Sequence, residues 1–216
     1  MKFRFQSARS GAKWRAMKKW IVTGGIGTGK SSFCQALKRA LPDLQLFSSD
    51  DAVHRAYESP AVRSRIATAL RISGGGVGDP AAFRSQVREV VVADPAARER
   101  LEGILHPHVW EELAEVQKAA SGAGVKVLVA EVPLYYETGR AVVADKIIVL
   151  AASQAVQLNR VRARPGVNEA TALALLKMQL PLHEKVALAD MAVWNDGSLG
   201  ALEQVAITLL KQVETS

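Results

Sequence analysis

The segment GGIGTGKS, residues 24–31, constrains the fold of this chain more than any other feature. It matches the pattern GxxxxGK(S/T), in which glycines let a loop turn its backbone N–H groups toward a phosphate. The run Trp20–Val22 before the segment is typical of a buried parallel strand, and Phe33 and Leu37 after it recur at helical spacing. Strand, glycine loop and helix in this order predict a phosphate site at the N-terminus of a helix in an α/β fold.

The segment also contains the side chains that a nucleotide site needs. Lys30 would bridge the β- and γ-phosphates of ATP, and the Ser31 hydroxyl would ligate Mg²⁺. The alternative is a glycine-rich turn that holds no ligand, but such a turn needs neither four glycines nor a lysine and a hydroxyl in these places. The residues expected to bind the nucleotide are Gly25, Gly27, Thr28, Gly29, Lys30, Ser31 and Ser32.

The composition is that of an ordinary globular protein. Of the 216 residues, 49% are hydrophobic and 23% are charged, so we expect one sizeable core, with or without a smaller subdomain. Apolar stretches such as VKVLVAEVPL are far shorter than the roughly 18 residues of a membrane span, so we expect no membrane partner. The single cysteine, Cys34, excludes an internal disulfide and is expected to be a small buried group, which fits a reducing, cytoplasmic compartment.

The net charge of +7 is concentrated at one end of the chain. Residues 1–16 carry five basic residues and no acidic one, and +7 less these five leaves +2 for the rest. Such an arm contacts nucleic-acid phosphates in some proteins and acts as a transit peptide in others. We favour a third interpretation, in which Met17 is the biological start and residues 1–16 are not part of the fold.

Strand-like runs alternate with helical patterns along the chain. The four that follow Trp20–Val22 are Leu44–Ser48, Val125–Val132, Asp145–Ala151 and Met191–Trp194. This alternation predicts a five-stranded parallel sheet covered by helices on both faces, with ligands at the carboxyl ends of its strands.

The interval between the second and third runs is too long for one crossover helix. Within it, Ser59, Asp79 and Asp94 each precede a proline, as is typical of a helix N-cap followed by the first helical residue. A helical insertion at this point is suited to form a lid or the wall of an acceptor site. The expected units are a nucleotide-binding core, residues 17–58 and 125–216, and an inserted helical domain, residues 59–124.

The segment FSSDDAVHRAY, residues 47–57, places two carboxylates at the end of the second predicted strand. A carboxylate there can orient an acceptor hydroxyl and take its proton during phosphoryl transfer. Asp50 and Asp51 are both candidates for this base. The alternative, for one of them but not for both, is that it N-caps a helix that begins near Ala52.

The segment QLNRVRARPG, residues 157–166, puts Arg160 and Arg164 four residues apart on one face of an expected helix, with Arg162 on another side. One interpretation is a solvated basic face. Beside a phosphate site, the better interpretation is a helical lid around residues 153–180 whose arginines neutralise charge in the transition state.

Together these motifs resemble one family, the dephospho-coenzyme A kinases. The similarity extends over nearly all of residues 17–210 and includes, in order, GGIGTGKSS, DDAVHRAY, LEGILHPHV, EVPLYYETG, RVRARPG and QLPLHEKVALADMAVWNDGS. It implies a P-loop kinase with an inserted helical acceptor-binding domain and a helical lid. The implied reaction is transfer of the γ-phosphate of ATP, with Mg²⁺, to the ribose 3′-hydroxyl of dephospho-CoA, the last step of coenzyme A synthesis.

The resemblance also implies roles for individual residues. Asp50 matches the general base of the family, with Asp51 as its neighbour. His106 and Pro107 match a His-Pro signature that forms part of the acceptor-binding wall. The remaining matches are Lys30 and Ser31 for ATP and Mg²⁺, Arg160 and Arg164 for the lid arginines, and Asn195 for the loop that flanks the adenine.

The chain departs from the family pattern at several positions. Ser48 and Glu131 each stand where the family usually has an aspartate, and Pro80 stands where it usually has an arginine. These departures affect the surroundings of the metal and the pantetheine side of the acceptor, and they leave the ATP motif intact.

Two other functions stay open at this level. One is a related P-loop kinase that acts on another small molecule, such as a nucleoside monophosphate or a sugar. The other is a non-catalytic nucleotide-binding module that uses residues 1–16 on RNA or DNA, although the near-neutral charge of the remaining chain argues against it. A zinc site at His106 and His108 is disfavoured, because no cysteine or further histidine stands near them in the sequence.

Overall fold

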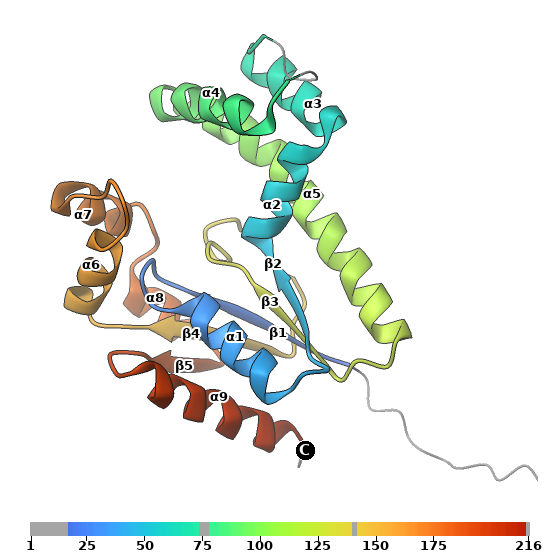
Figure 1. The fold of residues 1–216 in the computed structure, drawn as a ribbon, viewed down its shortest axis with the longest axis vertical. Coiled ribbons are helices and arrows are strands. Elements are labelled where there is room, and N and C mark those ends of the chain that lie inside the picture. The colour runs from blue at the N-terminus through green and yellow to red at the C-terminus, as the bar shows by residue number, and fades with distance from the viewer. Residues whose placement is uncertain (1–16, 74–77, 140–141, 215–216) are drawn as a thin grey trace, which may run out of the picture.

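The computed structural model describes residues 17–73, 78–139 and 142–214, and the predicted extension at 1–16 lies outside this part of the chain. The described residues form a five-stranded parallel sheet in the order β2-β3-β1-β4-β5 (Figure 1). Its strands are β1 (Lys18–Gly24), β2 (Gln45–Ser48), β3 (Val127–Glu131), β4 (Lys146–Ala151) and β5 (Met191–Trp194). The predicted five-stranded parallel sheet is confirmed.

Strand β1 is the centre of the sheet, where it pairs with β3 on one side and β4 on the other. Its run Trp20–Val22 is almost completely buried. A strand that is covered on both faces must be apolar along its length, and this run is. The carboxyl end of β1, at Gly24, therefore lies in the middle of the edge where folds of this kind bind their ligands.

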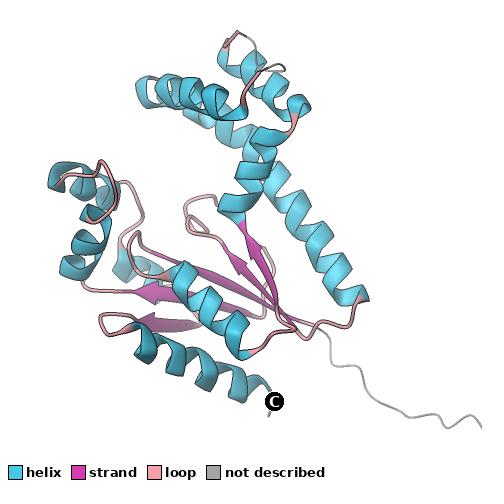
Figure 2. Ribbon diagram, viewed as in Figure 1, coloured by secondary structure: helices cyan, strands magenta, loops and turns pink. Residues whose placement is uncertain are grey.

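Helices cover both faces of the sheet and extend beyond it (Figure 2). They are α1 (Lys30–Ala40), α2 (Ser49–Glu58), α3 (Pro60–Leu70), α4 (Pro80–Ala93), α5 (Pro95–Gly122), α6 (Gln154–Arg162), α7 (Glu169–Lys177), α8 (Leu182–Ala187) and α9 (Leu199–Glu214). On one face, α1 and α9 pack on the strands through Phe33, Leu37 and Leu202. On the other face, α5 contributes Val109 and Trp110. The sheet thus has a hydrophobic core on each side.

The helices between β2 and β3 form a third core, away from the sheet (Figure 1). Tyr57, Ile66, Phe83 and Leu105, from four different helices, are buried there. Each of α3, α4 and α5 begins as the sequence predicts. The side chains of their N-cap residues accept hydrogen bonds from backbone N–H groups of the first turn, and a proline follows each cap: Ser59, Asp79 and Asp94.

Two helices connect the helical core to the sheet. In α5, Leu105 belongs to the helical core, whereas Val109 belongs to the core against the sheet. In α2, Ala56 belongs to the helical core, whereas Ala52 belongs to the core against the sheet. The helical part is therefore joined to the sheet by continuous helices that each take part in two cores.

The segment between β4 and β5 contains α6, α7 and α8. The first two pack against each other beside the loop that follows β1, and α8 packs against β1 and β4 (Figure 1). Cys34 is buried on α1, as expected. Throughout residues 17–73, 78–139 and 142–214, none of the helices combines the length and the apolar character that crossing a membrane requires.

The packing of the helical core leads to a prediction about the free energy of unfolding. Phe83 is 5% exposed and Val92, on the same helix, is 80% exposed. We expect Phe83→Ala to lower the free energy of unfolding by about 3 kcal/mol or more, because it leaves a cavity against Tyr57 and its neighbours. Val92→Ala should change it by less than about 0.5 kcal/mol. Urea titration followed by circular dichroism measures both, and equal losses would contradict this packing.

Candidate functional site

The loop between β1 and α1 presents an unsatisfied helix N-terminus. Gly29, the N-cap residue, has a φ of 91°, no side chain caps α1, and its first turn contains no acidic residue. The first N–H groups of the helix are therefore available to an anion, and the helix dipole adds partial positive charge. At the other end of the loop, a Cβ on Gly24 would lie 2.1 Å from the carbonyl oxygen of Leu150, so only glycine fits beside β4.

Side chains from three other segments hold this phosphate loop from outside. Asn195 Nδ2, which is buried behind the end of β5, donates to the Thr28 carbonyl at 2.9 Å. Arg160 Nη1 donates to the Gly27 carbonyl at 3.3 Å, and Gln179 Oε1 accepts the Ile26 N–H at 2.8 Å. The structure thus brings Asn195 and Arg160 to the predicted nucleotide site. The role of Asn195 beside an adenine stays a prediction.

Lys30 lies in a protected position at the start of α1. Its side chain is 8% exposed, and Nζ donates to the Gly25 carbonyl at 2.9 Å. Burial lowers the pKa of Lys30 from 10.5 to about 8, with the Glu131 carboxylate opposing the shift and the Lys185 ammonium adding to it. The loop therefore holds a cation that has lost most of its hydration, which strengthens its attraction for a phosphate.

Ser31 and Glu131 meet beside the phosphate loop. Ser31 Oγ donates to Glu131 Oε1 at 2.7 Å, and Glu131 is the last residue of β3, next to β1 in the sheet. Burial raises the pKa of Glu131, while the hydrogen bond from Ser31 and the charge of Lys30 oppose the shift. A hydroxyl and a carboxylate are ligands that Mg²⁺ prefers, so the residues present fit the predicted metal.

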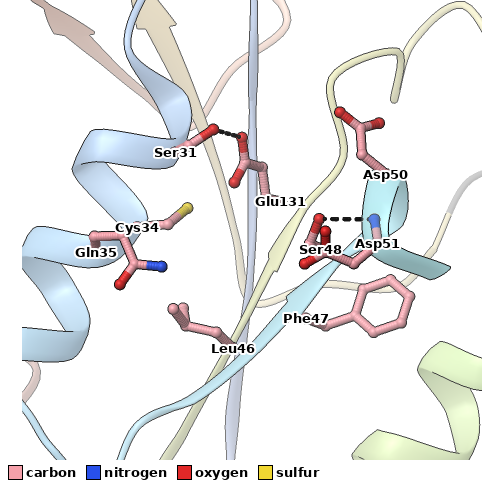
Figure 3. A pocket seen from close by; sticks show the side chains of 9 residues that line it. All are labelled: Ser31, Cys34, Gln35, Leu46, Phe47, Ser48, Asp50, Asp51 and Glu131. Atoms are coloured by element: carbon pink, nitrogen blue, oxygen red, sulfur yellow. Dashed lines mark hydrogen bonds between the residues drawn. The ribbon is translucent and has the colours of Figure 1, made fainter. Parts of the chain in front are cut away.

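A cavity of about 300 Å³ opens beside these groups (Figure 3). It lies between α1 on one side and β2 with the start of α2 on the other. Its polar lining includes Ser31, which the sequence predicts as a magnesium ligand, and both candidate bases, Asp50 and Asp51, together with Glu131. The complete lining is Ser31, Cys34, Gln35, Leu46, Phe47, Ser48, Asp50, Asp51 and Glu131.

The start of α2 differs from the prediction. The helix begins at Ser49, directly after β2, and its N-cap is Ser48, whose Oγ accepts the Asp51 N–H at 3.1 Å. The prediction that an aspartate caps a helix near Ala52 is wrong, because the serine hydroxyl caps the helix equally well three residues earlier. Both aspartates lie in the first turn, where the helix dipole favours negative charge, and both line the cavity.

The Asp50 carboxylate is exposed at the mouth of the cavity. Partial loss of hydration raises its pKa, the Lys30 ammonium opposes this shift, and Asp51 adds to it. Asp50 and Lys30 are therefore close enough to act on each other's charge, which places a proton acceptor near the phosphate loop.

Arg160 and Arg164, the predicted lid arginines, do not share a helix. Helix α6 ends at Arg162, and Arg164 lies in the turn that follows. The predicted pairing on one helical face is wrong, because Pro165 disfavours helical backbone at the residue before it and Gly166 has a φ of 73°. Arg164 is exposed, yet its charge contributes to lowering the pKa of Lys30, so it lies near the same site. Arg162 instead pairs with Glu169 at 3.0 Å.

His106 and Pro107 lie inside α5 and are half-buried. They stand between Leu105, in the helical core, and Val109, in the core against the sheet. Their contact with an acceptor stays a prediction. Within the described ranges, no group of three or more His, Cys, Asp or Glu side chains has the arrangement of a metal site.

Several contacts of the phosphate loop were not predicted from the sequence. They involve Gln157, which packs against Gly25, and Gln179, which accepts the Ile26 N–H. The ion pair of Lys185 with Glu137 was not predicted either. Gln179 and Lys185 both lie in the segment QLPLHEKV, whose mixed polar and apolar residues carry no pattern that predicts these contacts.

Comparisons of the sequence with known proteins identify one family, and comparisons of the structure show the same fold. Residues 20–201 match the family model of dephospho-CoA kinase. The dephospho-CoA kinase of Brucella melitensis is 33% identical over 183 residues, which cover 85% of this chain and 88% of that protein. The crystal structure of TT1252 from Thermus thermophilus has a TM-score of 0.76 and 26% identity, and the match covers 92% of this chain and 98% of that one. The dephospho-CoA kinase from Campylobacter jejuni has the same fold, with a TM-score of 0.58, 21% identity and coverage of 91% and 97%.

Because of the lowered pKa of Lys30, we expect its contribution to the free energy of unfolding to increase as the pH rises. Because its pKa is 10.5 when unfolded and about 8 when folded, burying the charge costs free energy below pH 8, and this cost disappears toward pH 10.5. The contribution of Lys30 to the free energy of unfolding should rise by up to about 3 kcal/mol across this window. Urea unfolding of the wild type and Lys30→Met at both ends of the window measures it, and a constant difference would contradict the burial of a charged Lys30.

Proposed function

Since the chain belongs to the dephospho-CoA kinase family, we propose that it transfers the γ-phosphate of ATP to the ribose 3′-hydroxyl of dephospho-CoA, giving coenzyme A and ADP. This is the last step of coenzyme A synthesis. The observation that carries the proposal is that Ser31, at the end of the phosphate-loop motif, lines one cavity with the Asp50 and Glu131 carboxylates, and that Lys30 is close enough for its charge to act on both carboxylates. The proposal includes a cytoplasmic location, which the single cysteine favours.

Asp50 is the general base in this proposal. The acceptor oxygen forms a bond to the γ-phosphorus, the bond from that phosphorus to the β–γ bridging oxygen breaks, and the hydroxyl proton passes to Asp50. Two features support this role: Asp50 stands at the mouth of the cavity, and its pKa is raised, so its carboxylate is a stronger proton acceptor than an ordinary aspartate.

Positive side chains neutralise the charge that the transferred group carries. Lys30 acts from the start of α1, and Arg160 acts from α6, where it already contacts the loop at Gly27. Arg164 is placed to approach from the following turn. These positive charges would stabilise the negative charge that the phosphoryl group carries in the transition state.

Ser31 and Glu131 would hold Mg²⁺. When bound, the ion supplies positive charge to the β- and γ-phosphate oxygens and orients them for transfer. The 2.7 Å contact between Ser31 Oγ and Glu131 Oε1 supports this assignment, because it already brings two oxygen ligands together.

The helical insertion would bind the acceptor, with His106 and Pro107 in its wall. The departures from the family pattern have structural roles that are compatible with this. Ser48 caps α2, and Pro80 is the first residue of α4. Neither removes a residue from the phosphate loop.

Replacing Lys30 tests the ATP site. We expect Lys30→Ala to lower turnover by at least about 10²-fold while the protein stays folded, because the lysine acts on phosphate charge. Lys38→Ala, on the same helix, should keep turnover, since Lys38 binds carbonyl groups at the far end of α1. A coupled assay of ADP release with dephospho-CoA measures both. Wild-type turnover with a different acceptor, and none with dephospho-CoA, would favour the related-kinase alternative.

The two aspartates should differ in their effect. Asp50→Asn keeps the shape of the side chain and removes the proton acceptor, so turnover should fall by roughly 10²- to 10⁴-fold with ATP affinity largely retained. Asp51→Asn should lower turnover by less than about tenfold, because the N–H that meets Ser48 is kept and Asn also suits the start of a helix. The reverse order of damage would assign the base to Asp51, and unchanged turnover in both would remove the base from the mechanism.

A further inference from the structure

A lysine with no exposed surface lies close to the phosphate loop. Lys185, on α8, has a side chain that is 0% exposed, and its Nζ lies 2.6 Å from Glu137 Oε1. The same Nζ lies 3.5 Å from the Pro133 carbonyl oxygen, which also accepts a hydrogen bond from Thr23 at the end of β1. The Glu137 side chain is 21% exposed. The ion pair is therefore buried at its lysine end.

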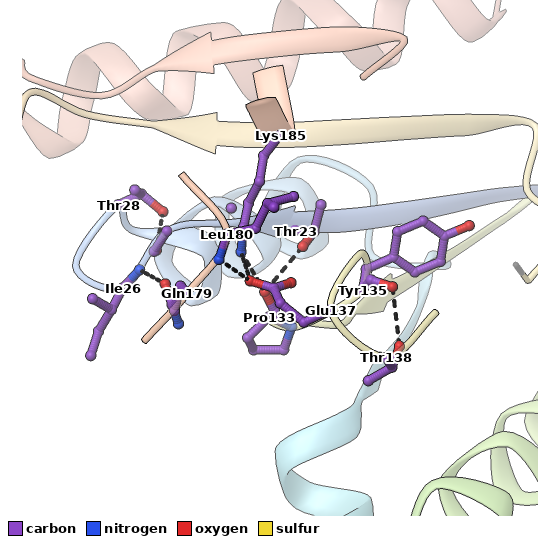
Figure 4. Close-up of polar contacts among 12 residues, drawn as sticks. Thr23, Ile26, Thr28, Pro133, Tyr135, Glu137, Thr138, Gln179, Leu180 and Lys185 are labelled. Carbon is purple, nitrogen blue, oxygen red and sulfur yellow. Dashed lines mark hydrogen bonds and ion pairs between the residues drawn. The ribbon is translucent and has the colours of Figure 1, made fainter. Parts of the chain in front are cut away.

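One carboxylate oxygen joins two segments that are distant in sequence. Glu137 Oε1 accepts the Leu180 N–H at 3.0 Å as well as pairing with Lys185 (Figure 4). Glu137 belongs to the loop after β3, whereas Leu180 and Lys185 follow α7. The pair thus fixes the segment 179–185 against the segment 133–139.

The residue next to Leu180 reaches the phosphate loop. Gln179 Oε1 accepts the Ile26 N–H at 2.8 Å, and Ile26 lies in the middle of the loop. A continuous set of contacts therefore runs from Glu137, through Leu180 and Gln179, to the backbone of the phosphate loop at Ile26 (Figure 4).

We propose that Lys185 and Glu137 are positioning residues, whose ion pair holds the segment 179–185 so that Gln179 keeps the phosphate loop in its nucleotide-binding shape. The inference deepens the proposed function and rests on it for the transfer step. Neither residue is required to touch a substrate. Their effect on the reaction passes through the position of Gln179 and the loop.

The physical cost of the pair favours this role over simple stabilisation. Removing a lysine from water is expensive, and apolar residues of similar volume often stabilise a protein as well as a buried ion pair does. The ion pair instead fixes the position of the segment 179–185, because the Lys185 ammonium and the Leu180 N–H both bind the same Glu137 oxygen. A displacement of about 1 Å in a catalytic site can cost on the order of 10²-fold in rate.

The test compares single variants with the neutral double variant. Lys185→Met and Glu137→Gln each break the pair, so both should lower the urea midpoint of unfolding, weaken ATP binding about tenfold and lower turnover about tenfold or more. The double variant has no unpaired buried charge, so its urea midpoint should recover. Its ATP affinity and turnover should stay as low as in the single variants.

Three further variants separate the effect of the Lys185–Glu137 pair on the phosphate loop from a general loss of stability. Gln179→Ala should weaken ATP binding by about the same factor without lowering the urea midpoint, whereas Met178→Ala, at an exposed neighbour, should change neither. Breaking the exposed pair with Arg162→Met and Glu169→Gln should also leave ATP binding unchanged.

The measurements are equilibrium dialysis with ATP, urea unfolding and ADP release with dephospho-CoA. Recovery of ATP affinity and turnover in the double variant would overturn the proposal, because the pair would then act only on stability. Normal ATP affinity in Gln179→Ala would overturn it as well, even if the single variants failed to fold. If the wild type binds ATP but does not phosphorylate dephospho-CoA, the proposed function fails, and the ATP affinities still decide whether the pair positions the loop.

Discussion

The structure depends on one constraint, which is that the phosphate loop must stay ordered while its inward N–H groups remain free for phosphate. A loop in that state cannot be held by its own hydrogen bonds alone. Here its carbonyl groups at Gly27 and Thr28 accept hydrogen bonds from Arg160 and Asn195, and its N–H at Ile26 donates to Gln179. The surroundings of the loop are therefore as much a part of the site as its glycines.

The parallel sheet makes these outside contacts possible. The strands all end at the same edge, so residues far apart in sequence arrive together: Glu131 at the end of β3, Ser48 at the end of β2 and Asn195 just after β5. The carboxylate that meets Ser31 and the helix start that carries Asp50 follow from this topology. The helical insertion follows β2 directly, through α2, so any acceptor that it binds is delivered to the same edge.

The sequence allowed prediction of features that depend on local pattern. Apolar runs marked the five strands, and a cap followed by proline marked three helix starts, because both signals lie within a few residues. Two local predictions differ from the structure. Ser48, and neither aspartate, caps α2, and α6 ends at Arg162 because Pro165 disfavours helical backbone at Arg164. The pairing of Lys185 with Glu137 was not predicted. The fold of the sheet brings these two residues together, and neither sequence segment contains a pattern that indicates the contact.

Burial has opposite effects on the pKa of the acidic and basic groups of the site, and this links their placement to the chemistry. It raises the pKa of Asp50 and Glu131 and lowers that of Lys30, so each group is moved toward its neutral form. A triphosphate brings negative charge to Lys30, and a divalent cation brings positive charge to Glu131, so both ligands favour the charged forms. The raised pKa of Asp50 makes its carboxylate a stronger proton acceptor than an ordinary aspartate, which suits the role of general base in the proposed mechanism.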